Sequence, residues 1–169
     1  MLIRQEECGD YETVHDVVTA AFASAEHSDG GEAKLVSALR KSSAFVPELS
    51  LVAVCGGKIA GHILFTKVTV GEQTALALAP LSVLPSCQDQ GIGQALIREG
   101  HRIARSLGYE YSIVLGHPHY YPKTGYRPAG LYGIRPPFQV PEENFMAVKL
   151  KPDAAPLDGI VQYDPAFGV

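Results

Sequence analysis

The spacing of apolar residues predicts two helices in the first quarter of the chain. Residues 11–23 carry apolar side chains three and four positions apart, a period that is typical of an amphipathic helix. Asp10 stands where the N-cap of this helix is expected, since a short acceptor side chain can bind the first free N–H groups. A second helix is predicted over residues 32–41, after a small and polar stretch at 24–31 that indicates a loop.

Runs of β-branched and other apolar residues predict strands on both sides of these helices. The expected strands cover residues 2–4, 51–55, 59–70 and 74–84. Gly56-Gly57 joins two of them and indicates a tight turn, and Pro47 is expected to close the helical section before them. Pro80 lies inside the last of these strands and has no N–H for the ladder. We therefore expect a bulge or a sheet edge at Pro80.

The second half of the chain contains the clearest helix, over residues 91–107, whose apolar positions share one face. A short strand is predicted at 111–115 and a final one at 144–150, with a segment rich in Gly, Pro, His and Tyr between them. Residues 151–169 hold three prolines and little periodicity. We expect one domain over residues 1–150, with 151–169 as a surface tail of the same domain.

Composition narrows the class of protein. The chain has 169 residues, of which 46% are hydrophobic and 19% charged, so it is long and apolar enough to fold around a core. The net charge of −4 argues against a nucleic-acid partner. Cys8, Cys55 and Cys87 form no CxxC pair, so neither a disulfide framework nor a metal site is expected. The sequence shows no apolar leader and no run of apolar residues long enough to span a membrane. We therefore expect no membrane association and a cytoplasmic location.

The most informative stretch is the junction at residues 83–93, where a predicted strand passes through a glycine-bearing loop into a helix. The first N–H groups of a helix are unpaired and carry partial positive charge, so the junction can bind an anion. A Walker loop is excluded because Gln94-Ala95 follows Gly93, and a Rossmann fingerprint because position 96 is leucine. Glycine spacing alone favours the simpler interpretation, a strand–loop–helix joint whose glycines serve packing alone.

The remaining pattern, Gln88-x-x-Gly91-x-Gly93, resembles the acetyl-CoA signature of the GNAT superfamily of N-acetyltransferases, in its bacterial predicted-acetyltransferase branch. The segment from Tyr120 to Tyr126 is similar to the family's aromatic-Tyr-x-x-x-Gly-Phe motif. The resemblance implies an α/β (α+β) fold: a central mixed, mostly antiparallel sheet with splayed fourth and fifth strands, flanked by helices. It also implies acetyl-CoA as cosubstrate.

The resemblance assigns roles to particular residues. Backbone groups at Leu81, Ser82 and Val83 are expected to bind the pantetheine arm, and the Val83 N–H to face the thioester carbonyl. The pyrophosphate is expected on the N–H groups of Gln88, Asp89, Gln90, Gly91, Ile92, Gly93 and Gln94. Tyr121 matches the residue that protonates the leaving thiolate, while Tyr120 is expected to serve packing.

The general base is less well determined. Glu32 opens a helix on the substrate-facing side of this fold and is the candidate, although a residue in this place is more often a cap or a solvated loop charge. Glu26 and His27 precede it, and His117 and His119 lie near Tyr121 as possible proton relays. The predicted activity is direct transfer of an acetyl group to a primary amine of a small molecule or peptide. The alternative is a catalytically idle acyl-CoA-binding or regulatory module. The sequence leaves open which amine is the acceptor and whether the protein forms a homodimer.

Overall fold

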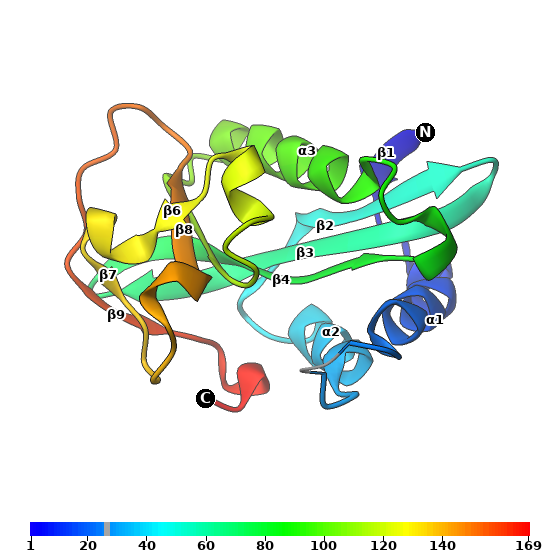
Figure 1. The fold of residues 1–169 in the computed structure, drawn as a ribbon, viewed down its shortest axis with the longest axis horizontal. Coiled ribbons are helices and arrows are strands. Elements are labelled where there is room, and N and C mark those ends of the chain that lie inside the picture. Colours follow the sequence, from blue (N-terminus) through cyan, green and yellow to red (C-terminus); the bar gives the residue numbers. More distant parts are fainter. Residues whose placement is uncertain (26–27) are drawn as a thin grey trace.

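The computed structural model describes residues 1–25 and 28–169, and nine of their segments form strands of one mixed sheet. The main path through the sheet runs β1-β2-β3-β4-β5-β8-β6, while β9 pairs with β3 and β7 pairs with β9 (Figure 1). The strands are β1 (Leu2–Gln5), β2 (Phe45–Cys55), β3 (Lys58–Val70), β4 (Gln73–Val83), β5 (Tyr111–Leu115), β6 (Arg127–Pro128), β7 (Ile134–Arg135), β8 (Phe145–Lys149) and β9 (Gly159–Gln162).

Helices cover both faces of the sheet (Figure 1). On one face α1 (Tyr11–Phe22) and α2 (Glu32–Arg40) pack their buried valines and leucines against β2 and β3. On the other face lies α3 (Ile92–Ser106), whose apolar stripe joins the largest core cluster together with β2, β3 and β4. The helices and the long strands are those that the apolar spacing predicts, with ends displaced by a few residues.

Strand β2 differs from its prediction, because it begins at Phe45 and contains Pro47 instead of starting after it. The pairing of β2 with β3 shifts register between Phe45 and Ser50, so the ladder is interrupted where Pro47 lies. A proline is tolerated there because no regular backbone donor is required at an irregular position.

The final segment also differs from the expected surface tail. Its strand β9 pairs antiparallel with the end of β3, with Val70 opposite Val161, and Val161 is fully buried. Further on, Phe167 packs against the cluster formed by α1 and α2. The C-terminal residues therefore close one edge of the core, and their short strand is too brief to produce a readable apolar period.

Pro80 produces the expected bulge in β4. Ile63 pairs with Leu81 and Phe65 with Leu78, so two residues of β4 lie opposite one residue of β3. On its other side β4 pairs in parallel with β5 only at Leu76 and Ala77. Beyond Ala77 the two strands diverge, as the resemblance implies, and the rest of β4 has an edge free of strand pairing.

Candidate active site

The free edge of β4 presents backbone groups from alternate residues. The Leu84 N–H donates to the Ala60 carbonyl at 2.8 Å, which makes His62 and Ser82 the next hydrogen-bonded pair of the antiparallel ladder. The intervening Val83, like Leu81, therefore turns its N–H and carbonyl away from β3 and toward the free edge. The Gln88 side chain donates to the Val83 carbonyl at 3.2 Å, which agrees with this orientation.

Ser82 does not share this orientation, although the sequence places it with Leu81 and Val83. Its backbone pairs with His62 on β3, and its side chain is buried with no hydrogen-bond partner among the described residues. Strand alternation explains the difference, because successive residues direct their backbone groups to opposite neighbours. Of the three expected pantetheine contacts, Leu81 and Val83 thus remain available at the edge.

The edge of β4 leads through a short 3-10 turn (Pro85–Cys87) to the start of α3. The first backbone bond across the start of this helix runs from the Ala95 N–H to the Gly91 carbonyl, at 3.0 Å. The N–H groups of Ile92, Gly93 and Gln94 have no acceptor among the described residues, as is usual for the first turn of a helix. Three donors at the positive end of a helix form a suitable site for an anion.

Gly91 and Asp89 shape the loop before the helix. Gly91 has a φ of +83° with open space around it, so its backbone conformation, and not crowding, favours glycine there. Asp89 adopts a φ of 61°, a region that Asp and Asn tolerate better than most side chains. Gln88, Asp89 and Gln90 are all exposed, and their N–H groups lie just before the helix.

At position 93 glycine is required for a different reason, which is close packing. A Cβ at this position would collide with the hydroxyl of Tyr120, and would also touch the side chain of Leu81 on β4. The ring of Tyr120 therefore fits against the first turn of α3 beside the free edge. The need for glycine at position 93 is therefore explained by packing. The absence of a side chain there also lets the start of α3 lie close to β4.

Tyr121 begins the 3-10 helix η3 (Tyr121–Thr124), and its ring is held from three sides. It packs on Gly116, where a Cβ would collide with the ring, and meets Tyr120 and Tyr126 edge-on at centroid distances of 5.1 and 5.7 Å. Its hydroxyl has no hydrogen-bond partner among the described residues. Burial raises the pKa of Tyr121 above its ordinary value, and the neighbouring Tyr120 adds to the shift.

Behind Tyr121, a buried polar cluster connects three elements. The Tyr126 hydroxyl lies 2.8 Å from the Ser112 Oγ of β5 and 3.1 Å from the His101 Nε2 of α3. All three side chains are buried. The cluster fixes the end of the Tyr121 segment to the strand and the helix on either side of it, so the Tyr121 ring has a rigid support.

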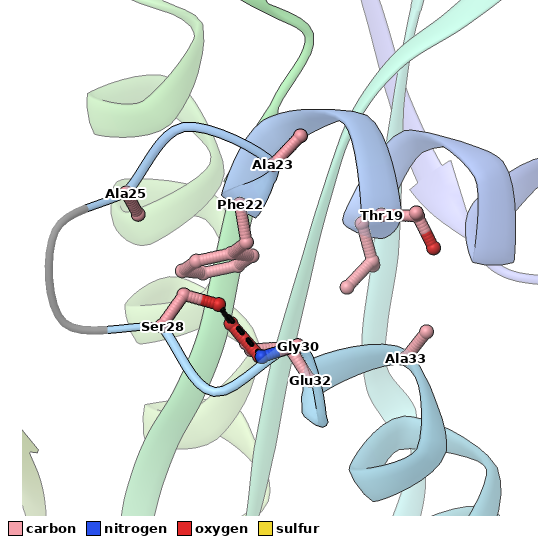
Figure 2. Close-up of a pocket in the computed structure, with 9 residues that line it drawn as sticks. Thr19, Phe22, Ala23, Ala25, Ser28, Gly30, Glu32 and Ala33 are labelled. Atoms are coloured by element: carbon pink, nitrogen blue, oxygen red, sulfur yellow. Dashed lines mark hydrogen bonds between the residues drawn. The ribbon is translucent and has the colours of Figure 1, made fainter.

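A cavity of about 310 Å³ lies between the end of α1 and the start of α2 (Figure 2). Thr19 and Phe22 line it from α1, and Ser28 and Glu32 from the loop and α2. Ser28 Oγ donates to Glu32 Oε1, while Glu32 Oε2 is buried without a partner among the described residues. Glu32 is the only ionisable side chain in the described lining, so the cavity favours a cation.

Comparison with known proteins assigns the family. The chain matches the Acetyltransferase (GNAT) family over residues 13–126, which includes the helix-start loop and the tyrosine segment. The chain belongs to this family. It is 41% identical to the uncharacterized N-acetyltransferase YjhQ of Escherichia coli strain K12 over 140 residues, covering 80% of this chain and 75% of the relative. It is 31% identical to the N-acetyltransferase YhbS of the same strain, covering 99% and 98% of the two chains.

Solved structures of GNAT proteins have the same fold. The crystal structure of Escherichia coli YhbS in complex with CoA has a TM-score of 0.90 and 28% identity, with 99% of this chain and 92% of that chain covered. A GNAT acetyltransferase from Brucella melitensis in complex with acetyl-CoA has a TM-score of 0.82 and 33% identity, with 98% and 97% covered. This chain therefore has the fold of these GNAT proteins, and it is an acetyltransferase.

The other predicted site residues of this GNAT protein are dispersed. His117 and His119 are both exposed, and in the described residues no group of three possible metal ligands comes together. Glu26 and His27 lie outside the residues that the structure describes. No hydrogen bond joins Glu32 to Tyr121, which lie on different elements. Within residues 1–25 and 28–169, no helix has the length and apolarity needed to cross a membrane.

Sequence reasoning underestimated two residues of the GNAT site. Tyr120 is a packing residue, as expected, but its packing partner is the first turn of α3 itself. Tyr126 stands where the family motif has Phe, and its additional hydroxyl forms the cluster with Ser112 and His101. That departure from the motif was the available signal for Tyr126, whereas the contact of Tyr120 with Gly93 depends on tertiary packing.

Proposed function

We propose that this GNAT protein transfers the acetyl group of acetyl-CoA to the primary amine of a small molecule or peptide. One observation carries the proposal: the free edge of β4 continues directly into the unpaired N–H groups of α3. In coenzyme A the two amides of the pantetheine arm are followed by a pyrophosphate, so an edge of backbone donors and acceptors followed by an anion site matches this part of the molecule in order. The complexes of YhbS with CoA and of the Brucella melitensis protein with acetyl-CoA support the choice of ligand.

In this proposal the pyrophosphate binds the N–H groups of Ile92, Gly93 and Gln94, with the loop of Gln88, Asp89 and Gln90 beside it. The pantetheine amides bind Leu81 and Val83 as a neighbouring strand would. The thioester then lies along the gap between β4 and β5. A Val83 N–H that faces the thioester oxygen stabilises the negative charge that develops there during attack.

The chemical step is direct attack on the thioester. The lone pair of the amine forms a bond to the acetyl carbonyl carbon, and collapse of the tetrahedral species breaks the carbon–sulfur bond. The thiolate leaves and takes the proton of the Tyr121 hydroxyl, while the positively charged nitrogen of the tetrahedral species loses one proton, which restores the tyrosine through the solvent. The raised pKa of Tyr121 keeps its phenol protonated at neutral pH, so a proton is available in every turnover.

We propose Glu32 as the residue that receives the acceptor and accepts its proton. Glu32 lines a cavity that has no other ionisable side chain in its described lining, and its buried Oε2 has no hydrogen-bond partner among the described residues; such a carboxylate suits an ammonium group. An ammonium cannot attack a carbonyl until it loses a proton. A carboxylate that binds the cation is placed to take that proton, provided the amine then reaches the thioester beside β4.

The experiment is a thiol-release assay with acetyl-CoA and a panel of amines, with mass spectrometry of the products. Transfer requires free CoA and an amine heavier by one acetyl group in equal amounts. A Gly91→Glu variant, in which a carboxylate enters the anion site, should bind no acetyl-CoA and release none. Tight binding of acetyl-CoA without release against any amine would favour the idle binding module instead.

A further inference from the structure

We infer that Arg98 and Lys123 bind the 3′-phosphate of coenzyme A and so distinguish it from 3′-dephospho-CoA. This inference rests on the proposed function, since it concerns the same cofactor. Neither residue belongs to the signature loop, and they come from different elements: Arg98 from the second turn of α3 and Lys123 from η3. The structure brings them together on one side of Tyr120.

The signature loop leaves most of the ligand's negative charge uncompensated. Gln88, Asp89 and Gln90 include one anion and no cation. The unpaired N–H groups of the first turn of α3 carry only about half a positive charge in total. They suffice to place a pyrophosphate, but coenzyme A carries a third phosphate, on its ribose. Further positive charge must come from elsewhere if that phosphate is recognised.

Arg98 and Lys123 supply such charge near the loop. The Arg98 Nη2 donates to the Lys123 carbonyl at 3.4 Å, and the Lys123 Nζ lies 5.8 Å from the centroid of the Tyr120 ring. The Tyr120 hydroxyl in turn lies against Gly93 in the first turn of the helix. The Tyr120 side chain thus lies between Lys123 and the first turn of α3, and Arg98 lies beside Lys123.

Both charges are free to bind a ligand. Neither Arg98 nor Lys123 forms an ion pair with any residue that the structure describes. The neighbouring Arg102, by contrast, is paired with Glu99 on the same helix. Arg98 and Lys123 are exposed, and the Arg98 charge partly offsets the burial that raises the pKa of Tyr120.

Position along the helix favours the 3′-phosphate over the pyrophosphate. Arg98 follows Gly93 by five residues, which is about 7.5 Å along the helix axis. A pyrophosphate bound by the first N–H groups is held at the helix end, whereas the Arg98 guanidinium lies beside η3, where its Nη2 donates to the Lys123 carbonyl. The ribose phosphate is separated from the pyrophosphate by the sugar, and can therefore lie beside this pair.

Calorimetric titration with CoA and with 3′-dephospho-CoA tests the inference. The wild-type protein should bind CoA about tenfold more tightly than dephospho-CoA, the difference expected for charge-assisted contacts to one phosphate. Arg98→Gln and Lys123→Gln should each weaken CoA binding, and the double variant should bind the two ligands equally. All three should leave the affinity for dephospho-CoA unchanged, and added salt should reduce the wild-type preference.

Arg102→Gln and Lys149→Gln are matched controls, since the first removes an exposed cation that is already paired with Glu99 and the second removes an exposed cation of β8. They should retain the wild-type preference for CoA. The inference is overturned if the double variant keeps that preference, or if it loses affinity for both ligands equally. If the wild-type protein binds neither ligand, the proposed function fails as well, so the two failures are distinguishable.

Discussion

The hydroxyl of Tyr120 lies against the Cα of Gly93, and the two residues fit together only because position 93 has no Cβ. This contact joins the tyrosine segment that follows β5 to the helix that follows β4. The two parts of the proposed active site are therefore assembled by packing between them, and not only by the shared sheet. A glycine in an anion-binding signature serves here to bring a second motif into place.

The contact predicts a strong coupling between the two positions. Gly93→Ala should destabilise the protein by about 1–3 kcal/mol, because the new methyl group must displace the Tyr120 hydroxyl. In a Tyr120→Phe background the same change should be neutral or should stabilise by up to about 1 kcal/mol, since alanine is the better helix residue. Urea unfolding of the four proteins in this cycle measures the coupling. Additive effects at the two sites would contradict the contact.

Much of the fold follows from the sequence because long elements carry a clear period. The apolar stripe of α3 and the runs of β3 and β4 are long enough to identify the elements, and Pro80 indicates the bulge by its missing N–H. Strand β9 has only four residues, Gly159–Gln162, and is stabilised by its tertiary neighbours. A period cannot be recognised over that length, so residues 151–169 read as a tail.

The cavity at Glu32 predicts a specific kinetic effect. Glu32→Gln keeps the shape of the side chain but removes its charge, so kcat/KM for a cationic amine should fall by about two orders of magnitude or more. The affinity for acetyl-CoA should not change, because the described contacts of Glu32 lie within the loop before α2 and not at the cofactor edge. Initial rates at saturating acetyl-CoA measure the effect on the amine.

Ser28→Ala is the control for the Glu32 variant. It removes the hydroxyl that donates to Glu32 Oε1 and leaves the carboxylate in place. Its effect should be much smaller than that of Glu32→Gln. Equal losses in both variants would indicate that the loop conformation, and not the negative charge, is what the reaction requires.

His101 predicts how stability depends on pH. Burial, together with the positive charge of Arg105, lowers the pKa of His101 to about 4. In the unfolded chain the pKa is about 6.5, so between these values the unfolded state binds a proton that the folded state does not. The free energy of unfolding should therefore fall by up to about 3 kcal/mol from this residue as pH decreases from 6.5 to 4.

Urea unfolding at a series of pH values tests this dependence. His101→Gln keeps a polar group near the Tyr126 hydroxyl but cannot titrate, so its stability should depend less on pH between 4 and 6.5. The exposed His15 provides the control, and His15→Gln should retain the wild-type slope. Identical slopes in wild type and His101→Gln would contradict the assignment.

The site was less predictable than the fold, for reasons that individual residues make clear. The signature glycines and Tyr121 can be found because they occupy fixed spacings in the sequence. Whether Ser82 faces the free edge depends on the hydrogen-bond alternation of β3 and β4, which no local pattern reveals. Arg98 and Lys123 are 25 residues apart and become neighbours only when η3 packs along α3.

The most direct test of the account is the effect of Tyr121→Phe on transfer to an amine that the panel identifies. The variant keeps the ring that packs on Gly116, Tyr120 and Tyr126 and removes only the hydroxyl. If Tyr121 protonates the leaving thiolate, kcat should fall by about one to three orders of magnitude while KM for acetyl-CoA changes little. Tyr120→Phe should have a much milder effect. Wild-type kcat in Tyr121→Phe, with the chemical step shown to limit the rate, would contradict the account.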